Sequence, residues 1–364
     1  MSNDKLKHRI KWIIVILAFA GIEFISLRPH WVEKFYTYDF YPQLSLLLRT
    51  LLGWIPFSIG DVIYTIVIIY VIHRSVRVIN RLVKHNLSKK DVGIFSKKLL
   101  FKGLWIFVLF YGLWGLNYSR IGIAGQMQLE EKEYTEKDLD TLVSVLQKRL
   151  NDHAKYVTGF SRDSFKTNKK LFLNTSLAYQ QAALKYPFLQ YAHPSIKPTI
   201  FGYIGNFMGF QGYYNPFTGE AQINTTIPQC ELPFVATHEV AHQLGYAKES
   251  EANFVAFLAC RLHPSPTFRY SVYFDMFLYA TKELSDIDSS KAAYYQTKLH
   301  PIVKQDIEVL RKFYQRYRNP IEPLISRFYG YFLMANNQPK GRESYSEVVT
   351  WLIAYYKKWG IIAL

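Results

Sequence analysis

The segment His238-Glu239-Val240-Ala241-His242 could bind a metal ion and activate water. Histidines four residues apart lie above one another on one face of an α-helix, so both imidazoles can reach the same ion. Glu239 would lie beside that ion and could accept a proton from water. This is the H-E-x-x-H motif of zincin hydrolases. We therefore predict His238 and His242 as Zn²⁺ ligands and Glu239 as the catalytic base.

The third metal ligand has two candidates in the next segment, Glu249 and Glu251. Zincins complete their site with a carboxylate or histidine from a following element and leave one position open for water. We favour Glu249, because Asn253 would lie on the same helical face and could orient a ligand. Glu251 stays an alternative, because it directly precedes Ala252 as ligand glutamates do in other zincins. Acidic residues at a helix N-terminus would also explain either glutamate without a metal.

The residues around the motif predict a buried helix. Pro233 is tolerated in a first turn, residues 234–244 contain no Gly or Pro, and Gly245 stands where a left-handed C-terminal cap is expected. Glu239 is the only acidic residue in this helix, and Lys and Arg are absent from it, as burial requires. The competing interpretation is a structural helix with two hydrogen-bonded histidines.

The distribution of charge indicates a membrane protein rather than a nucleic-acid-binding one. The formal net charge is +16, and residues 1–102 hold 16 Lys and Arg against 6 Asp and Glu. The basic residues occupy short segments between apolar runs, which is the pattern of the positive-inside rule. We therefore expect a lipid bilayer as a partner and no nucleic acid.

The apolar runs predict three transmembrane helices and two domains. The predicted spans are residues 12–27, 51–72 and 103–119, with a basic cytoplasmic loop at 73–102. Residues 1–119 would then form a membrane domain, and residues 120–364 an extracytoplasmic domain that carries the motif.

The second domain is predicted to be mainly α-helical with a small sheet, an α+β fold. Residues Glu220–Ile227 are our candidate for an edge strand that could pair with a peptide substrate. Periodicity and capping residues predict helices at 135–151, 173–186, 249–262, 268–284, 301–317 and 344–358.

Two further features leave alternatives open. Cys230 and Cys260 flank the motif and could form a disulfide outside the cytoplasm, or could be two buried thiols. A donor for the oxyanion of the transition state is also needed. The candidates for it are Tyr246, His263, Tyr273 and Tyr345.

Four segments together resemble a known family. They are Tyr41-Pro42, Pro56–Asp61, Asn215–Ala221 and His238–Asn253. The resemblance is to an uncharacterised bacterial multi-pass membrane-protein family, a domain of unknown function with a gluzincin-like zinc peptidase domain. It implies the zincin-like fold, a place in the bacterial inner membrane, two histidine ligands with a glutamate between 249 and 251, and Glu239 as the base. The gap between His242 and Glu249 is shorter than in well-studied gluzincins.

These observations favour a membrane-anchored zinc metallopeptidase that hydrolyses peptide bonds of a peptide or protein substrate on the extracytoplasmic side. The alternative is a non-catalytic membrane protein whose zincin-like domain binds peptide or envelope components. Glu239 favours the enzyme, because binding alone does not require a base. The oligomeric state stays open.

Overall fold

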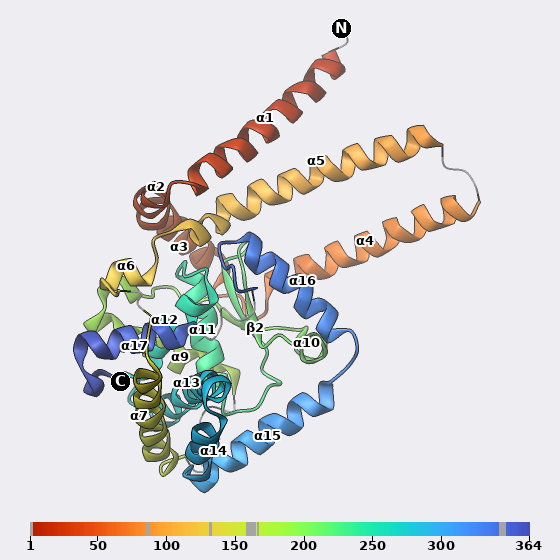
Figure 1. The fold of residues 1–364 in the computed structure, drawn as a ribbon. Helices are drawn as coiled ribbons and strands as arrows, with labels where there is room; N and C mark the ends of the chain where they lie inside the picture. The colour runs from red at the N-terminus through yellow and green to blue at the C-terminus, as the bar shows by residue number, and fades with distance from the viewer. Residues whose placement is uncertain (1–2, 85–87, 131–132, 158–164, 166, 342–346) are drawn as a thin grey trace.

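Three long helices protrude from a mostly helical body in the computed structural model of the chain (Figure 1). They are α1 (Asn3–Ser26), α4 (Ile59–Val83) and α5 (Lys89–Leu113). The structure describes all residues except 1–2, 85–87, 131–132, 158–164, 166 and 342–346. A mainly helical fold with one small sheet is confirmed for the described residues.

The prediction of three membrane spans is wrong. Among the described residues only Ile59–Arg81 of α4 is long and apolar enough to cross a membrane, and a second span arises only if Leu6–Ser26 and Pro29–Leu52 count as one helix bent by 99°. The expected span at 103–119 fails because α5 ends at Leu113. Gly115–Ser119 forms a buried 3₁₀ turn, η2, so these residues belong to the body and not to a membrane helix.

The short sheet has the strand order β1-β3-β2. β1 (Ile196–Pro198) pairs parallel with β3 (Glu220–Ile223), and β2 (Gly212–Asn215) pairs antiparallel with β3. The expected edge strand at 220–227 is therefore central, and β2 is the edge strand on the side of the metal motif. Extended strands of this length carry no signal for their position in a sheet, because pairing is decided by segments distant in sequence.

Glu220 joins the sheet to the beginning of α4. Its carboxylate accepts hydrogen bonds from the backbone N–H groups of Ile59 and Gly60, at 3.1 and 2.7 Å, and from the hydroxyl of Ser58 at 3.2 Å. The first N–H groups of a helix lack partners within the helix, and a carboxylate there also interacts favourably with the helix dipole. A residue of β3 thus caps α4, although the two are about 160 positions apart in sequence.

Two further buried charges hold the same junction. Asp61 accepts hydrogen bonds from the Tyr213 hydroxyl (2.5 Å), the Thr199 hydroxyl (2.9 Å) and the backbone N–H of Ile200 (2.8 Å). Lys197 on β1 donates to the carbonyl oxygens of Gly53, at 2.7 Å, and Ile55 in the turn before α4. The candidate membrane helix is therefore fixed rigidly to the sheet beside the motif.

We expect Glu220→Ala to lower the free energy of unfolding by about 2–3 kcal/mol, because it leaves several buried donors without their charged acceptor. Glu308→Ala is the control, since Glu308 only forms surface ion pairs with Arg311 and Lys312 and should change stability by less than about 1 kcal/mol. Thermal unfolding of the detergent-purified chain measures both. Equal effects of the two substitutions would contradict the capping role of Glu220.

The helices predicted at 135–151, 173–186, 249–262, 268–284 and 301–317 are present with shifted bounds. Of the helix predicted at 344–358, residues 344–346 lie outside the described residues and the remainder is present as Val348–Trp359. The helices Gly202–Met208, Ser289–Thr297 and Glu322–Ala335 were not anticipated. Helix α7 packs along α13, and the C-terminal α17 packs beside both. The remaining elements are α2 (Pro29–Trp31), η1 (Val32–Phe40), α3 (Tyr41–Leu52), α6 (Ile123–Met127), α7 (Glu136–Ala154), α9 (Asn168–Lys185), η3 (Pro187–Leu189), α10 (Gly202–Met208), α11 (Leu232–Gln243), α12 (Glu249–Cys260), α13 (Pro266–Ile287), α14 (Ser289–Thr297), α15 (Pro301–Tyr317), α16 (Glu322–Ala335), α17 (Val348–Trp359) and η5 (Ile361–Ala363).

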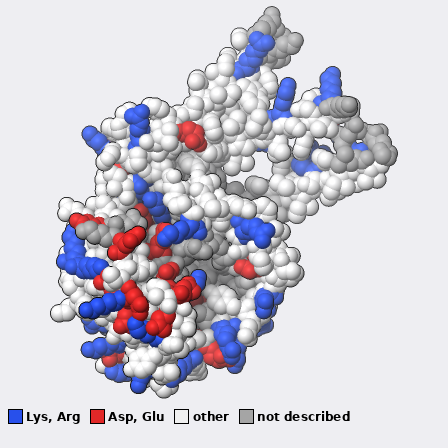
Figure 2. Space-filling model, in the orientation of Figure 1, with Lys and Arg blue, Asp and Glu red and all other residues white. Residues whose placement is uncertain are grey.

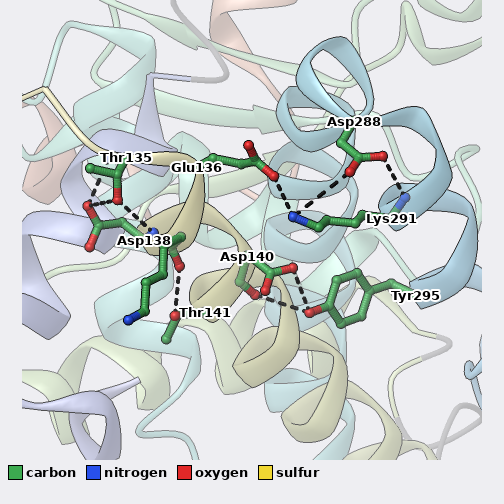
Figure 3. A network of polar contacts seen from close by, with 9 residues as sticks. Thr135, Glu136, Asp138, Asp140, Thr141, Asp288, Lys291 and Tyr295 are labelled. Carbon is green, nitrogen blue, oxygen red and sulfur yellow. Dashed lines mark hydrogen bonds and ion pairs between the residues drawn. The ribbon is translucent and has the colours of Figure 1, made fainter.

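The start of α7 shows why that helix was predictable. Thr135 and Asp138 form a capping box, in which each side chain accepts a hydrogen bond from the other residue's backbone N–H (Figure 3). Lys291 of α14 lies between Glu136 and Asp288 and joins the two helices. On the other side, the ammonium group of Lys357 lies 2.6 Å from Asp138.

We expect Asp138→Asn to lower the free energy of unfolding by about 1 kcal/mol at neutral pH. Burial acts to raise the pKa of Asp138, but hydrogen bonds from Lys357 and Thr135 lower it from 3.8 to about 2. The ionised form thus stabilises the folded chain above pH 4, and that contribution is lost as the pH falls through 2. Unfolding measured between pH 2 and 7 should show the variant and the wild type converging at low pH. A constant difference would contradict a role for the carboxylate charge.

Cys230 and Cys260 are both buried and form no disulfide bond. The thiol of Cys260 on α12 lies 3.1 Å from the hydroxyl of Thr237 on α11, and burial raises its pKa to about 12. The interpretation as two buried thiols therefore fits the structure.

Candidate metal centre

Two consecutive helices at the centre of the body carry the motif. Every residue of α11 and of α12 is buried. Pro233 stands in the first turn of α11, and Gly245 follows its end with a φ of +90°, which only glycine adopts without strain. The short turn 244–248 then brings the start of α12 back beside the two histidines, so Glu249 is the first residue of α12.

Three ligand atoms converge at this turn. Oε2 of Glu249 lies 3.2 Å from Nε2 of His238 and 3.4 Å from Nε2 of His242. One ligand atom from each of the three residues lies within 4.8 Å of the other two, and all three side chains are buried. The structure therefore brings together both histidines of the motif and the first of the two candidate glutamates.

The arrangement fits a metal ion. Around a tetrahedral Zn²⁺ with bonds of about 2.0–2.2 Å, neighbouring ligand atoms lie about 3.3–3.6 Å apart, close to the distances found here. Oε2 of Glu249 is buried and accepts no hydrogen bond. Nδ1 of His242 lies 2.7 Å from the carbonyl oxygen of Tyr246, so a proton on Nδ1 leaves the Nε2 lone pair facing the carboxylate. The lone pair of Nε2 and the carboxylate of Glu249 repel each other unless a positive charge lies between them.

A proton can supply that charge where no metal is bound. Burial acts to lower the pKa of His242, but the Glu249 carboxylate raises it to about 9. A buried carboxylate between two imidazoles thus attracts either a proton or a cation.

Glu239 is not one of the three converging residues but faces the same cavity. Its side chain lies against Gly212, the first residue of the edge strand β2. A Cβ atom at position 212 would come within 2.6 Å of Oε1 and 2.7 Å of Cγ of Glu239. Oε2 is buried without a hydrogen bond, and burial raises the pKa of Glu239 to about 8. Gly212 therefore provides the space in which the carboxyl group of Glu239 can stand beside the ligands.

We expect Gly212→Ala to displace the Glu239 side chain without unfolding the protein, because the clash is with the end of a flexible side chain. Metal content should not change, whereas hydrolytic activity should fall by about 100-fold, the cost of a misplaced catalytic group. Gly205→Ala, whose Cβ would meet the ring of Phe210, is the control for a packing defect near the cavity. Loss of metal from Gly212→Ala would contradict this interpretation.

Glu251 points to a different part of the molecule. Its carboxylate lies against Gly122, where a Cβ would come within 1.9 Å of Oε1, and Gly122 has a φ of +85°. Burial raises the pKa of Glu251, while Lys248, Arg120 and a hydrogen bond from the backbone of Ile123 act to lower it. Glu251 thus binds the segment that follows η2 and does not belong to the group of converging ligands.

Tyr329 of α16 is a site residue that sequence reasoning missed. Its hydroxyl donates a 2.6 Å hydrogen bond to Oε1 of Glu249, which leaves Oε2 directed at the histidines. The backbone N–H of Glu249 is bonded to Oε1 of Gln338, at 3.0 Å. Asn253, expected to orient a ligand, interacts with His238 and with Tyr279. Outer partners of this kind fix the orientation of ligands.

The N-terminal region holds the end of the metal-binding helix. Carbonyl oxygens at a helix C-terminus lack partners within the helix. Trp114 donates to the carbonyl of His242 at 2.9 Å, Tyr41 to that of Gln243 at 2.7 Å, and Arg120 to that of Gly245 at 3.0 Å. The division of the chain at residue 119 stays a prediction, and the contacts of Tyr41 and Trp114 cross it.

The candidates for an oxyanion donor are engaged elsewhere. The hydroxyl of Tyr246 donates to Gln126, that of Tyr273 donates to the carbonyl of Leu364, and the ring of His263 stacks on Phe268 at 4.2 Å. None of these three lines the cavity at the site, and Tyr345 lies outside the described residues. Tyr279 and Tyr329 do line it, and burial raises the pKa of Tyr279, so its hydroxyl stays protonated and can donate.

The site opens into one large cavity of about 1330 Å³. His238, Glu239 and Asn253 form its floor together with Phe234 and Val235. The walls come from α4, α10, β2, α15 and α16. A water molecule and a substrate can therefore reach the exposed side of the ligand group from this cavity.

Comparison with known proteins identifies the family. No curated protein and no solved structure matches the chain. Residues 36–353 match the model of the family described as "Protein of unknown function (DUF3810)". This range contains α4, the sheet, both metal-site helices and Tyr329, and it covers most of the chain. The chain therefore belongs to the DUF3810 family.

Proposed function

We propose that the protein is a membrane-anchored, zinc-dependent metallopeptidase. The observation that carries this proposal is the convergence of His238, His242 and Glu249 at distances suited to one ion, with Glu239 beside them in the same cavity. Two imidazoles and one carboxylate are the ligands of many catalytic zinc sites, and they leave a position open for water.

Each residue of the site would then have a separate role in amide hydrolysis. Bound Zn²⁺ would supply a Lewis acid and lower the pKa of water to about 7. Glu239 accepts the proton that this water loses and delivers it to the leaving amine. Gly212 positions Glu239, and Tyr329 orients Glu249. A peptide can add to the free edge of β2, whose first residue touches Glu239.

The proposed location is a bacterial inner membrane, with the body on its extracytoplasmic side. Lys and Arg lie at the far ends of the protruding helices and also over the body, where Asp and Glu gather (Figure 2). Arg74, Arg77 and Arg81 stand in the distal part of α4, and Lys90, Lys97 and Lys98 in the distal half of α5. Basic flanks face the cytoplasm under the positive-inside rule, so the body would lie on the opposite side.

The test combines metal analysis with hydrolysis. The full chain, purified in detergent without added metal, should contain about one zinc per chain by elemental analysis, as one three-ligand site implies. It should hydrolyse members of a fluorogenic peptide library, lose this activity with a chelator, and regain it with Zn²⁺. Zinc without any hydrolysis would favour a peptide-binding protein instead. Failure of the purified wild type to bind zinc would refute the proposal.

A further inference from the structure

The cavity above the metal site has one wall made by the candidate membrane helix. Tyr64, Thr65 and Val67–Ile69 of α4 line it, opposite residues of α15. The side chains of Val67–Ile69 are about half exposed. The motif that could hydrolyse a substrate and the helix that could cross a membrane therefore share one open space.

The length of α4 places this wall inside the bilayer. A hydrocarbon core of about 30 Å needs about 20 helical residues. The candidate span of α4, Ile59–Arg81, has 23 residues, and its distal part carries the basic flank Arg74, Arg77 and Arg81. The segment between Asp61 and Arg74, residues 62–73, has no Asp, Glu, Lys or Arg, so it is the part suited to the hydrocarbon core, and it contains all of residues 64–69. A bilayer that surrounds α4 must therefore reach the wall of the cavity.

The two helices beside that wall also expose apolar side chains. α10 and α16 line the cavity and lie on the side of the body from which α4 emerges (Figure 1). Aromatic and aliphatic residues on such an exposed surface mark contact with a membrane or a partner rather than with water. Their large side chains that are at least about 40% exposed include Tyr203, Ile204, Phe207, Leu324, Phe328 and Tyr331.

The wall formed by α15 carries polar groups. Arg311 and Gln315 of α15 and Arg318 just after it line the cavity, together with Tyr314 and Tyr317. A transmembrane peptide helix would be apolar on all sides, so this wall would leave its own polar groups facing an apolar surface. An amphiphile suits both walls, because its acyl chain can lie on α4, α10 and α16 while its polar part lies towards α15 and the metal site.

We propose that the substrate enters the site from the bilayer and carries an acyl chain that occupies the cavity between α4, α10 and α16. The inference of a substrate rests on the peptidase function proposed above, whereas the binding of an acyl chain does not. The substrate class is thus a lipid-modified peptide, whose amide bond reaches Glu239 while its chain stays in contact with the membrane.

Photolabelling tests the occupant without catalysis. The full-length chain is reconstituted in phosphatidylcholine vesicles that contain a phospholipid with a diazirine in the middle of its acyl chain. We expect adducts on Phe234 and Val235, which are only 3% exposed and lie on the cavity floor, where lipid outside the protein cannot reach. Absence of these adducts, with labelling of Ile66 on the outer face of α4, would overturn the inference.

A matched pair of variants on α16 tests whether the label reaches the floor through the cavity. Ile325 lines the cavity, whereas its neighbour Leu324 is 53% exposed and does not. Ile325→Trp should narrow the cavity and reduce the adducts on the floor, while Leu324→Trp should leave them. Persistence of the adducts in both variants would contradict the proposed cavity. If a photoreactive polyleucine helix labelled the floor and the phospholipid did not, the occupant of the cavity would be a peptide helix and not an acyl chain.

Hydrolysis distinguishes failure of this inference from failure of the proposed function. One peptide cleaved by the wild type is compared with its N-palmitoylated form in the same vesicles. We expect the acylated peptide to be cleaved with the higher kcat/KM, and Ile325→Trp to remove that preference while metal content is unchanged. Cleavage of both peptides at equal rates would refute the acyl-chain inference and leave the peptidase. Photolabelling of the floor without any hydrolysis would refute the peptidase and leave the binding of an acyl chain.

Discussion

Glu239→Gln should abolish most hydrolytic activity while leaving the metal in place. Glu239 faces the cavity but is not one of the three converging ligands, so its replacement removes the proton acceptor and no metal bond. A general base contributes a factor of about 10²–10⁴ to the rate, which is about 3–5 kcal/mol of transition-state stabilisation. The loss should appear in kcat, because the substrate still binds along β2 and in the cavity.

The control for this variant lies at the other end of the same helix. Glu231, the N-cap residue of α11, is also buried and accepts a 2.9 Å hydrogen bond from Gln211. Glu231→Gln makes the same chemical change about two helical turns from Glu239, and we expect activity within a few-fold of the wild type. Elemental analysis and single-turnover hydrolysis measure both variants. Equal losses in the two, or loss of zinc from Glu239→Gln, would contradict the assignment of Glu239 as the base.

The parts of the site that lie close in sequence could be predicted from it. Pro233 and Gly245 mark the ends of α11, and the motif between them places two imidazoles on one face. The choice of Glu249 over Glu251 rested on its spacing to Asn253, a weak signal. The difference between the two glutamates arises from what surrounds them: the histidines for Glu249, and Gly122 with Arg120 for Glu251.

Tyr329 could not be found in this way. It lies 80 positions from Glu249 in sequence, on a helix that no pattern had indicated. One of 28 tyrosines becomes a site residue only when α16 folds over the cavity. Gly212 is likewise one of 19 glycines in the chain, and only its contact with Glu239 distinguishes it.

The membrane spans were misjudged because hydropathy does not show which apolar residues the body buries. Residues 53–58 carry no charge, but they form the turn that Lys197 and Glu220 hold against the sheet, so no membrane helix runs through them. Trp114 and Tyr118 belong to a buried cluster behind His242. An aromatic-rich segment can thus satisfy a hydropathy criterion by packing against protein instead of lipid.

Glu249→Ala should weaken metal binding, whereas Glu251→Ala should keep the metal and lower the stability of the fold. Removing Glu249 leaves two imidazoles and no carboxylate for the ion. We expect zinc affinity to fall by more than about 100-fold, because even outer partners of a ligand contribute 10- to 100-fold. Removing Glu251 should leave about one zinc per chain, since this carboxylate is directed at Gly122 and not at the histidines.

The cost of the second substitution should instead appear as instability. Without Glu251 the buried N–H of Ile123 and the charges of Arg120 and Lys248 lose a partner, which should lower the free energy of unfolding by about 1–3 kcal/mol. Competition with a zinc chelator and thermal unfolding of the metal-free chain measure the two effects separately. If folded Glu251→Ala lost its zinc while Glu249→Ala retained it, the third ligand would be Glu251, and the group at His238, His242 and Glu249 would be an ion pair without a metal.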